Sequence, residues 1–408
     1  MFACLTLLCL ASCSIRPQNK IVLWTDRPEF ALYTEYFNAG QDKYKVEVRY
    51  LEFPAQKLIE AGDYPDVVVA SWLRNASIRS HFRSLDSVFR NDGLSRSSFY
   101  PRLLSLGNMD GRQYLLPVNY NIPAMVFADD SSWSPSNPFI IEMEEVKERS
   151  RAFNSMSRGV YTKMGFSIST NDDFLFFATT LFGTAFREAS PIAWNSQALE
   201  QSMIWIQSWI AEANTSIQME DDFAFKYFYE PPDKLVNSRR VLFTYIDGSS
   251  FFTLPEERRA NLDFRWIAMG EKIPLDEGGV YFGIHKKTKA FKAAKAFAQW
   301  FFAFETQRLL LEAGKSKRLS ETSFGIAGGF SAMKTVTEMV FPLFYPDLLG
   351  RMPPESYISP GNILPRNWII LKKRVILPYL RERIRHENRT EVRSLERRIS
   401  DWYRFNRD

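Results

Sequence analysis

Cysteine, histidine and long apolar runs are scarce in this sequence of 408 residues. No cysteine follows Cys13, so no disulfide bond can form within the rest of the chain. The three histidines, His81, His285 and His386, are far apart and show no metal-ligand spacing, which argues against a zinc or manganese capture protein. No long uninterrupted apolar stretch follows Leu10, so we expect no transmembrane helix.

The short motifs of the commoner enzyme classes are also missing. There is no Gly-x-Ser-x-Gly nucleophile elbow, no phosphate-binding P-loop and no Gly-x-Gly-x-x-Gly after a strand. Asp172 and Asp173 are adjacent, whereas the two carboxyl groups of a glycosidase lie about 5 to 9 Å apart on opposing walls. We therefore expect a protein that is not an enzyme and that holds no cofactor and no metal.

The composition is that of a globular protein, with 45% hydrophobic and 24% charged residues. Aromatic residues make up 15%, which indicates either a bulky core or a surface that recognises flat apolar faces. The net charge is +5, but residues 372–408 alone carry 12 Lys and Arg against 6 Asp and Glu. Because the basic excess belongs to one terminal segment, we expect no nucleic-acid partner.

The first residues look like a processing and attachment signal. An apolar run from Phe2 leads into Leu10-Ala11-Ser12-Cys13, which resembles the lipobox of bacterial lipoproteins. In that family a signal peptidase cuts before a cysteine whose sulfur has been acylated. All three cysteines lie in or beside this segment, although no Lys or Arg precedes the run as a signal peptide would normally require. We expect residues 1–12 to be a signal peptide, Cys13 to carry the lipid and residues 13–19 to form a tether; the alternative is the ordinary start of a core element.

The next stretch predicts a doubly wound α/β domain. Apolar strands at residues 21–24, 46–50 and 66–70 alternate with helical patterns that begin near Phe30 and Pro54. Ligands of such sheets bind beyond the carboxyl ends of the strands. Trp24 and Trp72 lie at two such ends, so together they indicate a stacking site.

Four short motifs follow one another along the chain. They are Ile21-Val22-Leu23-Trp24, Tyr64-Pro65-Asp66-Val67, Asp110-Gly111-Arg112-Gln113-Tyr114-Leu115-Leu116-Pro117 and Gly278-Gly279-Val280-Tyr281-Phe282-Gly283-Ile284. Their order resembles that of the sugar-type extracellular solute-binding proteins of ABC importers, the family that includes maltose-binding proteins. The resemblance implies two α/β lobes, joined by crossing strands, with a ligand cleft between them. The first lobe would comprise residues 20–117 and 264–314, and the second residues 118–263 and 315–408, with crossings at 118–127 and 264–269.

The resemblance, combined with the positions of strand ends, also implies a set of cleft residues. Aromatic side chains would stack on a sugar ring, Asp, Asn and Ser would bond its hydroxyl groups, and a glycine would allow close backbone approach. These residues are Trp24, Trp72, Asn121, Asp173, Asp247, Ser249, Gly279, Tyr281 and Trp368. The family usually has a glycine followed closely by a tryptophan after the strand at 241–246, whereas this chain has Ser249-Ser250-Phe251. Phe251 or Phe252 is the candidate substitute for the missing stacking residue.

The implied function is capture of a sugar or polyol by a monomer that lies outside the cytoplasm, is held at the membrane through Cys13 and delivers its ligand to the permease subunits of an ABC importer. The alternative is a protein of the same fold that acts as a surface adhesin or sensor, or that binds a non-sugar solute. The basic terminal segment is helical in pattern. It is either a solvated helix face or a contact surface for anionic lipid headgroups or for the importer.

Overall fold

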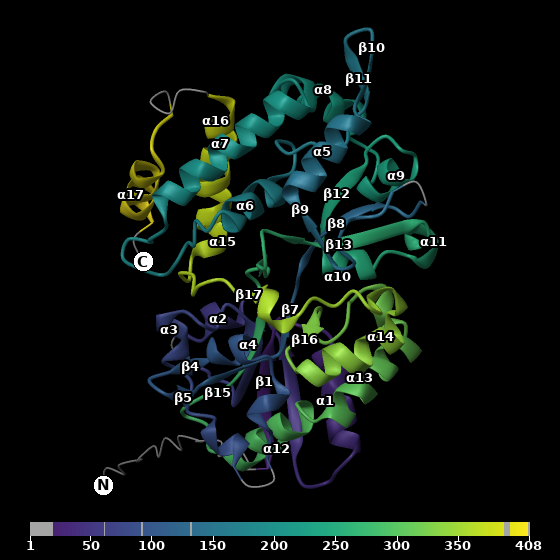
Figure 1. The fold of residues 1–408 in the computed structure, drawn as a ribbon. Helices are drawn as coiled ribbons and strands as arrows, with labels where there is room; N and C mark the ends of the chain where they lie inside the picture. The colour runs from purple at the N-terminus through teal and green to yellow at the C-terminus, as the bar shows by residue number, and fades with distance from the viewer. Residues whose placement is uncertain (1–18, 61, 91–92, 131–132, 387–391, 407–408) are drawn as a thin grey trace, which may run out of the picture.

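The chain folds into two α/β lobes, which lie one above the other in Figure 1, with several segments crossing between them. The computed structural model describes residues 19–60, 62–90, 93–130, 133–386 and 392–406. Cys13 and the lipobox lie outside the described residues. This architecture confirms the predicted two-lobed α/β fold.

The first lobe is built on a five-stranded sheet in the order β2-β1-β3-β15-β6. The strands are Lys45–Tyr50 (β2), Lys20–Thr25 (β1), Val67–Ser71 (β3), Val280–Ile284 (β15) and Leu115–Pro117 (β6). The strand β1 is parallel to β2 and β3, and β15 runs antiparallel to β3. Every residue of β3 and β15 is buried, as expected for strands covered on both faces.

Helices pack beside this sheet through aromatic side chains. The helices are Phe30–Ala39 (α1), Phe291–Phe301 (α12) and Phe304–Ser316 (α13). The ring of Phe37 lies 5.1 Å from that of Phe297, and the ring of Phe30 lies 5.2 Å from that of Phe301. The ring of Phe297 also lies 6.2 Å from that of Phe282 in β15. Burial of each such side chain contributes about 1.5 to 3 kcal/mol, so these contacts hold α1 and α12 together and α12 against the sheet.

The second lobe is built on a four-stranded sheet in the order β12-β8-β13-β9. Its strands are Phe243–Asp247 (β12), Pro123–Ala128 (β8), Leu262–Ala268 (β13) and Ile140–Glu142 (β9). Its core also contains buried residues of Met143–Phe153 (α5), Asp172–Leu181 (α6) and Ser196–Ala213 (α7), and of the helices at the end of the chain. Trp209 of α7 is fully buried in that core, next to Phe166.

The crossings are shorter than the sequence predicts. Residues 123–127 and 264–268 were expected to cross between lobes, but they belong to β8 and β13 of the second sheet. There Phe264 pairs with Val126, and Trp266 pairs with Ala124. The chain therefore crosses through residues 118–122 and returns through residues 269–279. A buried sheet strand and a buried crossing strand have the same apolar composition. The sequence pattern alone therefore could not show that residues 123–127 and 264–268 belong to the sheet.

Residues 319–348, expected in the second lobe, contact both lobes. The backbone N–H of Ala327 donates a hydrogen bond to the hydroxyl of Tyr33 in α1, at 3.2 Å. The ring of Phe324 stacks on Phe252 of the second lobe at 4.9 Å. This segment therefore fills the space between the lobes on the side of α13 and α14 (Phe341–Phe344; Figure 1).

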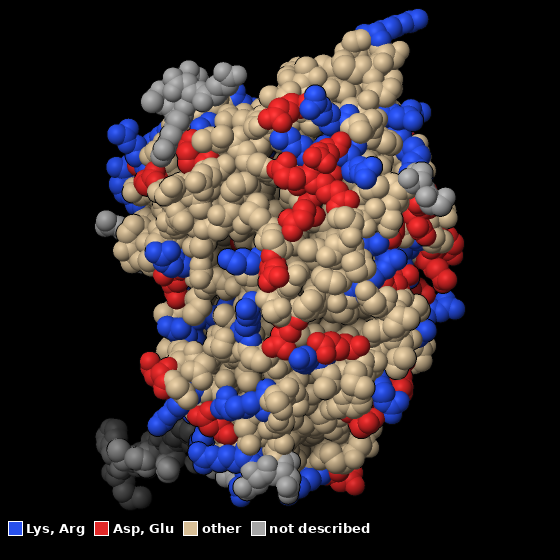
Figure 2. Space-filling view, in the orientation of Figure 1, with Lys and Arg blue, Asp and Glu red and all other residues tan. Residues whose placement is uncertain are grey.

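The basic terminal segment packs along the second lobe, on its left in Figure 1, as helices α15 (Trp368–Leu371), α16 (Leu377–Arg385) and α17 (Leu395–Phe405). Its guanidinium groups pair with carboxylates of that lobe: Arg383 with Glu200 at 2.6 Å and Arg385 with Asp221 at 2.9 Å. Lys and Arg side chains are accordingly intermixed with Asp and Glu on the face shown in Figure 2. Part of the basic excess therefore attaches the terminal helices to the second lobe.

The remaining α-helices and β-strands are, apart from the ten-residue α8, short. They are α2 (Pro54–Lys57), α3 (Ala76–Arg79), α4 (Pro101–Ser105), β4 (Asn108–Met109), β5 (Arg112–Gln113), β7 (Asn119–Tyr120), β10 (Ser155–Ser157), β11 (Val160–Lys163), α8 (Ile217–Lys226), α9 (Pro232–Asn237), α10 (Gly248–Phe252), α11 (Glu256–Arg259), β14 (Ile273–Pro274), β16 (Phe330–Ser331) and β17 (Ile358–Ser359). None of the helices in the described ranges combines the length and the apolar character that a membrane span requires.

Candidate functional site

A cavity of about 620 Å³ lies between the two lobes. The first lobe contributes Trp72, which follows β3. The second lobe contributes one side of α6 and the end of β12, and two connecting segments, 272–278 and 359–364, complete the walls. The cavity therefore lies where the ligand of a two-lobed binding protein is expected, between the carboxyl end of a first-lobe strand and the second lobe.

Trp72 is held in an unusual backbone conformation. Its φ of 66° is in the left-handed region, which bulky residues rarely occupy. The turn is fixed by Asn75, whose side-chain amide donates to the Trp72 carbonyl oxygen at 3.0 Å while its oxygen caps α3. The half-buried indole packs against apolar clusters of both lobes. Such strain, of about 1 to 3 kcal/mol, concentrates at ligand sites, which supports a binding role for this ring.

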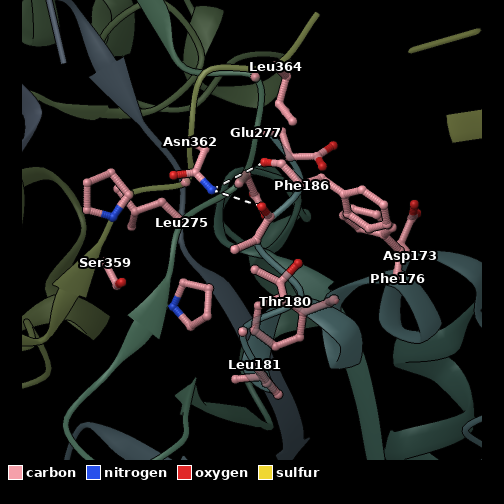
Figure 3. A pocket seen from close by; sticks show the side chains of 18 of the residues that line it. Asp173, Phe176, Thr180, Leu181, Phe186, Leu275, Glu277, Ser359, Asn362 and Leu364 are labelled. Atoms are coloured by element: carbon pink, nitrogen blue, oxygen red, sulfur yellow. Dashed lines mark hydrogen bonds between the residues drawn. The ribbon is translucent and has the colours of Figure 1, made fainter. Parts of the chain in front are cut away.

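The second-lobe wall is aromatic. Asn171 caps α6 by accepting a hydrogen bond from the Phe174 backbone N–H at 2.9 Å, which sets the direction of the helix. Phe176 and Phe177 of α6 and Phe186, which follows it, line the cavity, and Figure 3 shows Phe176 and Phe186 on one side of it. These rings offer flat apolar faces of the kind on which the C–H faces of sugars stack.

Four acidic side chains supply the polar part of the lining. Asp173, Asp247, Asp276 and Glu277 all line the cavity. Burial, followed by the negative charges of Asp247 and Glu277, raises the pKa of Asp276 to about 7, against the opposing effect of Lys372. Burial, followed by these nearby carboxylates, also holds the pKa of the Tyr245 hydroxyl well above its usual value.

Lys372 connects the acidic and aromatic walls. Its Nζ lies 2.9 Å from Glu277 Oε2 and 3.7 Å from the centre of the Phe176 ring. The aromatic wall therefore already accommodates a positive charge over a ring face.

Hydrogen bonds close the mouth of the cavity on two sides. The side-chain amide of Asn362 donates hydrogen bonds to the carbonyl oxygens of Ala185 and Phe186, at 3.1 and 3.3 Å (Figure 3). On the other side, the Glu188 carboxylate accepts a hydrogen bond from the Ala76 backbone N–H at the start of α3. The structure therefore shows the lobes in contact across the entrance.

Three of the predicted site residues, Trp72, Asp173 and Asp247, line this cavity. Asp247 also caps α10, accepting from the Ser250 backbone N–H at 2.9 Å and from the Ser249 hydroxyl at 2.5 Å. The Ser249 hydroxyl is thus hydrogen-bonded to Asp247, and Ser249 does not line the cavity. Gly279 is next to the lining residue Gly278 but is not itself part of the lining. The binding roles of all these residues stay predictions.

The other predicted residues lie behind the cavity walls. Trp24, Tyr281 and Trp368 are buried, and Trp368 supports the aromatic wall through its contact with Phe186 at 5.3 Å. The Asn121 amide donates to the Gly328 carbonyl oxygen at 3.0 Å. None of the four lines the cavity.

The suggested substitutes for the missing tryptophan do not line the cavity either. Phe251 and Phe252 are 1% and 3% exposed and pack against Phe264 in a core that both lobes share. The expectation that one of them stacks on the ligand in this cavity is therefore wrong. The helix α10 begins at Gly248 and directs both rings into that core.

Several lining residues were missed at the sequence level. Asp276, Glu277 and Lys372 were not singled out, although Asp276-Glu277 directly precedes the glycine pair of a recognised motif. Within the described ranges no group of three or more His, Cys, Asp or Glu side chains could hold a metal ion.

No protein-family model and no curated protein sequence matches the chain. Solved structures do resemble it. A cyclo/maltodextrin-binding protein complexed with maltotetraose aligns over 97% of this chain and 100% of its own, with 16% identity and a TM-score of 0.66. The cyclic α-maltosyl-1,6-maltose binding protein from Arthrobacter globiformis aligns over 93% and 96%, with 12% identity and a TM-score of 0.63.

The ABC substrate-binding protein Lmo0181 from Listeria monocytogenes, in complex with cycloalternan, aligns over 95% of this chain and 98% of its own, with 12% identity and a TM-score of 0.61. At such identities the likeness establishes the fold. The chain therefore has the two-lobed fold of the maltodextrin-binding type of ABC substrate-binding protein.

Proposed function

We propose that this protein captures a soluble carbohydrate in the cavity between its lobes and delivers it to a membrane importer. The observation that carries the proposal is the composition of the cavity: Trp72, Phe176 and Phe186 supply ring faces, and four carboxylates supply hydrogen-bond acceptors. Sugars present this combination of an apolar C–H face and hydroxyl donors. The solved structures of the same fold were determined with oligosaccharides, which supports this ligand class.

Closure of the lobes would trap the ligand. Trp72 belongs to the first lobe yet packs against the second, so a ligand beside it gains contacts from both lobes only in the closed form. Such a ligand shifts the population towards closure by its differential affinity for that form. Binding alone, without bond cleavage, is the role that this arrangement serves.

The experiment is a thermal-shift and calorimetric screen of mono- and oligosaccharides. A ligand at a hundredfold excess over its Kd stabilises the folded protein by about 2.7 kcal/mol. We expect at least one saccharide to raise the unfolding temperature and to give a single binding site. If no saccharide shifts the unfolding temperature while a peptide or polyamine does, the carbohydrate assignment fails.

We further propose that the protein is tethered through an acylated Cys13. The support is the lipobox-like segment and the absence of any later cysteine. Mass spectrometry of the membrane fraction should find a diacylated or triacylated Cys13 as the first residue, and an unmodified Cys13 within a longer chain would contradict the tether.

A further inference from the structure

The cavity carries more negative than positive charge. Its lining contains four carboxylates and two ammonium groups, Lys272 and Lys372. Lys372 is engaged by Glu277 at 2.9 Å, and Lys272 is exposed to solvent. The charge of the remaining carboxylates is therefore not balanced by a buried cation among the described lining residues.

Two of these carboxylates differ in how their oxygen atoms are used. Those of Asp247 accept hydrogen bonds from the Ser250 backbone N–H and from two serine hydroxyls. The side chain of Asp276 is half-buried, and no described residue donates a hydrogen bond to it. Its own backbone N–H is fixed by the Asn121 carbonyl oxygen at 3.1 Å, so the loop is held in place. Asp276 is thus a positioned acceptor whose donor must come from solvent or from the ligand.

The surroundings of Asp276 favour a positive donor over a neutral one. Asp173, Asp247 and Glu277 all add to the negative potential at this carboxyl group. A charge-assisted hydrogen bond to a carboxylate contributes about 1.5 to 3 kcal/mol, more than a neutral bond. Lys372 over the Phe176 ring shows that a cation and an aromatic face already coexist in this cavity.

We propose that the ligand is a saccharide that carries a protonated amine, with the ammonium group on Asp276 and the sugar ring on the aromatic wall. This inference rests on the proposed carbohydrate-binding function and names its substrate class. A neutral sugar would satisfy Asp276 through a hydroxyl group but would leave the excess negative charge of the cavity uncompensated.

The experiment compares ligands that differ only at one substituent. Glucosamine, N-acetylglucosamine and glucose, each as monomer and as β-1,4-linked trimer, are titrated calorimetrically into the full-length protein at low and high salt. The pH is 7.5, above the pKa of about 7 of Asp276, so that its carboxyl group is mostly ionised. We expect the amine to bind about tenfold more tightly than the matched N-acetyl and hydroxyl compounds. We also expect the preference to fall with added salt.

The variant Asp276→Asn should abolish the preference for the amine. Asp222→Asn, which makes the same charge change at an exposed position of α8, should keep it. Equal or tighter binding of the neutral compounds overturns this inference and leaves the carbohydrate function standing. Binding of spermidine without any saccharide overturns both.

Discussion

The guanidinium of Arg74 reaches across the mouth of the cavity and donates a hydrogen bond to the carbonyl oxygen of Asn362 at 3.1 Å. Arg74 belongs to the first lobe, and its guanidinium lies 5.4 Å from the centre of the Tyr281 ring, which keeps it extended. Asn362 is in turn bonded to the second lobe through Ala185 and Phe186. The hydrogen bond between Arg74 and Asn362 therefore joins the two lobes and exists only while they are together, so it stabilises the closed form.

Arg74→Ala should therefore speed ligand release. One hydrogen bond from a charged group contributes about 1.5 to 3 kcal/mol, so we expect the dissociation rate to rise about tenfold or more. Stopped-flow fluorescence with a bound saccharide measures this rate. The control is Arg79→Ala in α3, because no described contact joins the Arg79 side chain to the second lobe. Equal dissociation rates for both variants would contradict the prediction that Arg74 stabilises the closed form.

Trp72 and Trp24 should respond differently to truncation. Trp72→Ala removes a half-buried ring from the cavity, so we expect affinity to fall while the protein still folds. Trp24→Ala removes a ring that is only 3% exposed in the core, so we expect a loss of about 3 to 5 kcal/mol of stability. Calorimetry and urea denaturation separate the two effects. Unchanged affinity in Trp72→Ala would remove this residue from the site.

The raised pKa of Asp276 predicts how stability depends on pH. The folded state holds this proton with a pKa of about 7, against an ordinary value of 3.8. The stabilising contribution is therefore full below about pH 4 and is lost as the pH rises through 7. Asp276→Asn has no proton to lose, so without ligand it should exceed the parent in stability at pH 8 by about 1 to 3 kcal/mol.

Urea denaturation of the parent and the variant at pH 5 and pH 8 tests this expectation. Asp222→Asn is again the control, and its stability should follow that of the parent at both values. If Asp276→Asn follows the parent as closely as the control does, the carboxyl group titrates near its ordinary pKa.

The sequence predicted the layered α/β fold because β1 and β3 are short apolar runs that only a doubly covered sheet can bury. It placed the lobe boundaries less well. The composition of Phe264–Ala268 suits a crossing segment and an inner strand equally well. Its pairing with β8 is what makes it a strand of the second sheet. Such pairing depends on residues more than a hundred positions away, which local composition does not encode.

The cavity residues were predictable only where local geometry determines their place. Trp72 follows a strand end, which placed it at the cleft, whereas Asp173 was expected there only from the resemblance to the solute-binding family. Trp24 follows the same strand-end logic, yet its ring turns into the core beside Ala55 and Leu58. Lys372 enters the cavity because α15 packs on α6, with the ring of Trp368 5.8 Å from that of Phe176, and Lys372 is the residue that follows α15. This tertiary contact has no sequence signature.

The buried ion pair between Arg383 and Glu200 gives the last prediction. Arg383 is 2% exposed, and its guanidinium contacts Glu200 at 2.6 Å and the His386 carbonyl oxygen at 2.8 Å. Arg383→Ala would leave the Glu200 carboxylate without this partner, which typically costs about 3 to 5 kcal/mol when a pair is fully buried. Because Glu200 is 21% exposed, we expect a smaller loss of about 2 kcal/mol, measured by urea denaturation.

The matched control for this pair is Arg397→Ala, an exposed arginine on α17, which should change stability by no more than about 0.5 kcal/mol. The same two variants separate the two interpretations of the basic segment. If its arginines serve to fix the helices, Arg383→Ala alone lowers stability, and neither variant alters sedimentation with anionic vesicles. Loss of vesicle binding in Arg397→Ala, with stability unchanged, would instead assign the exposed face of α17 to contact with lipid headgroups. An exposed arginine contributes little to folding stability, but its charge is attracted to anionic lipid.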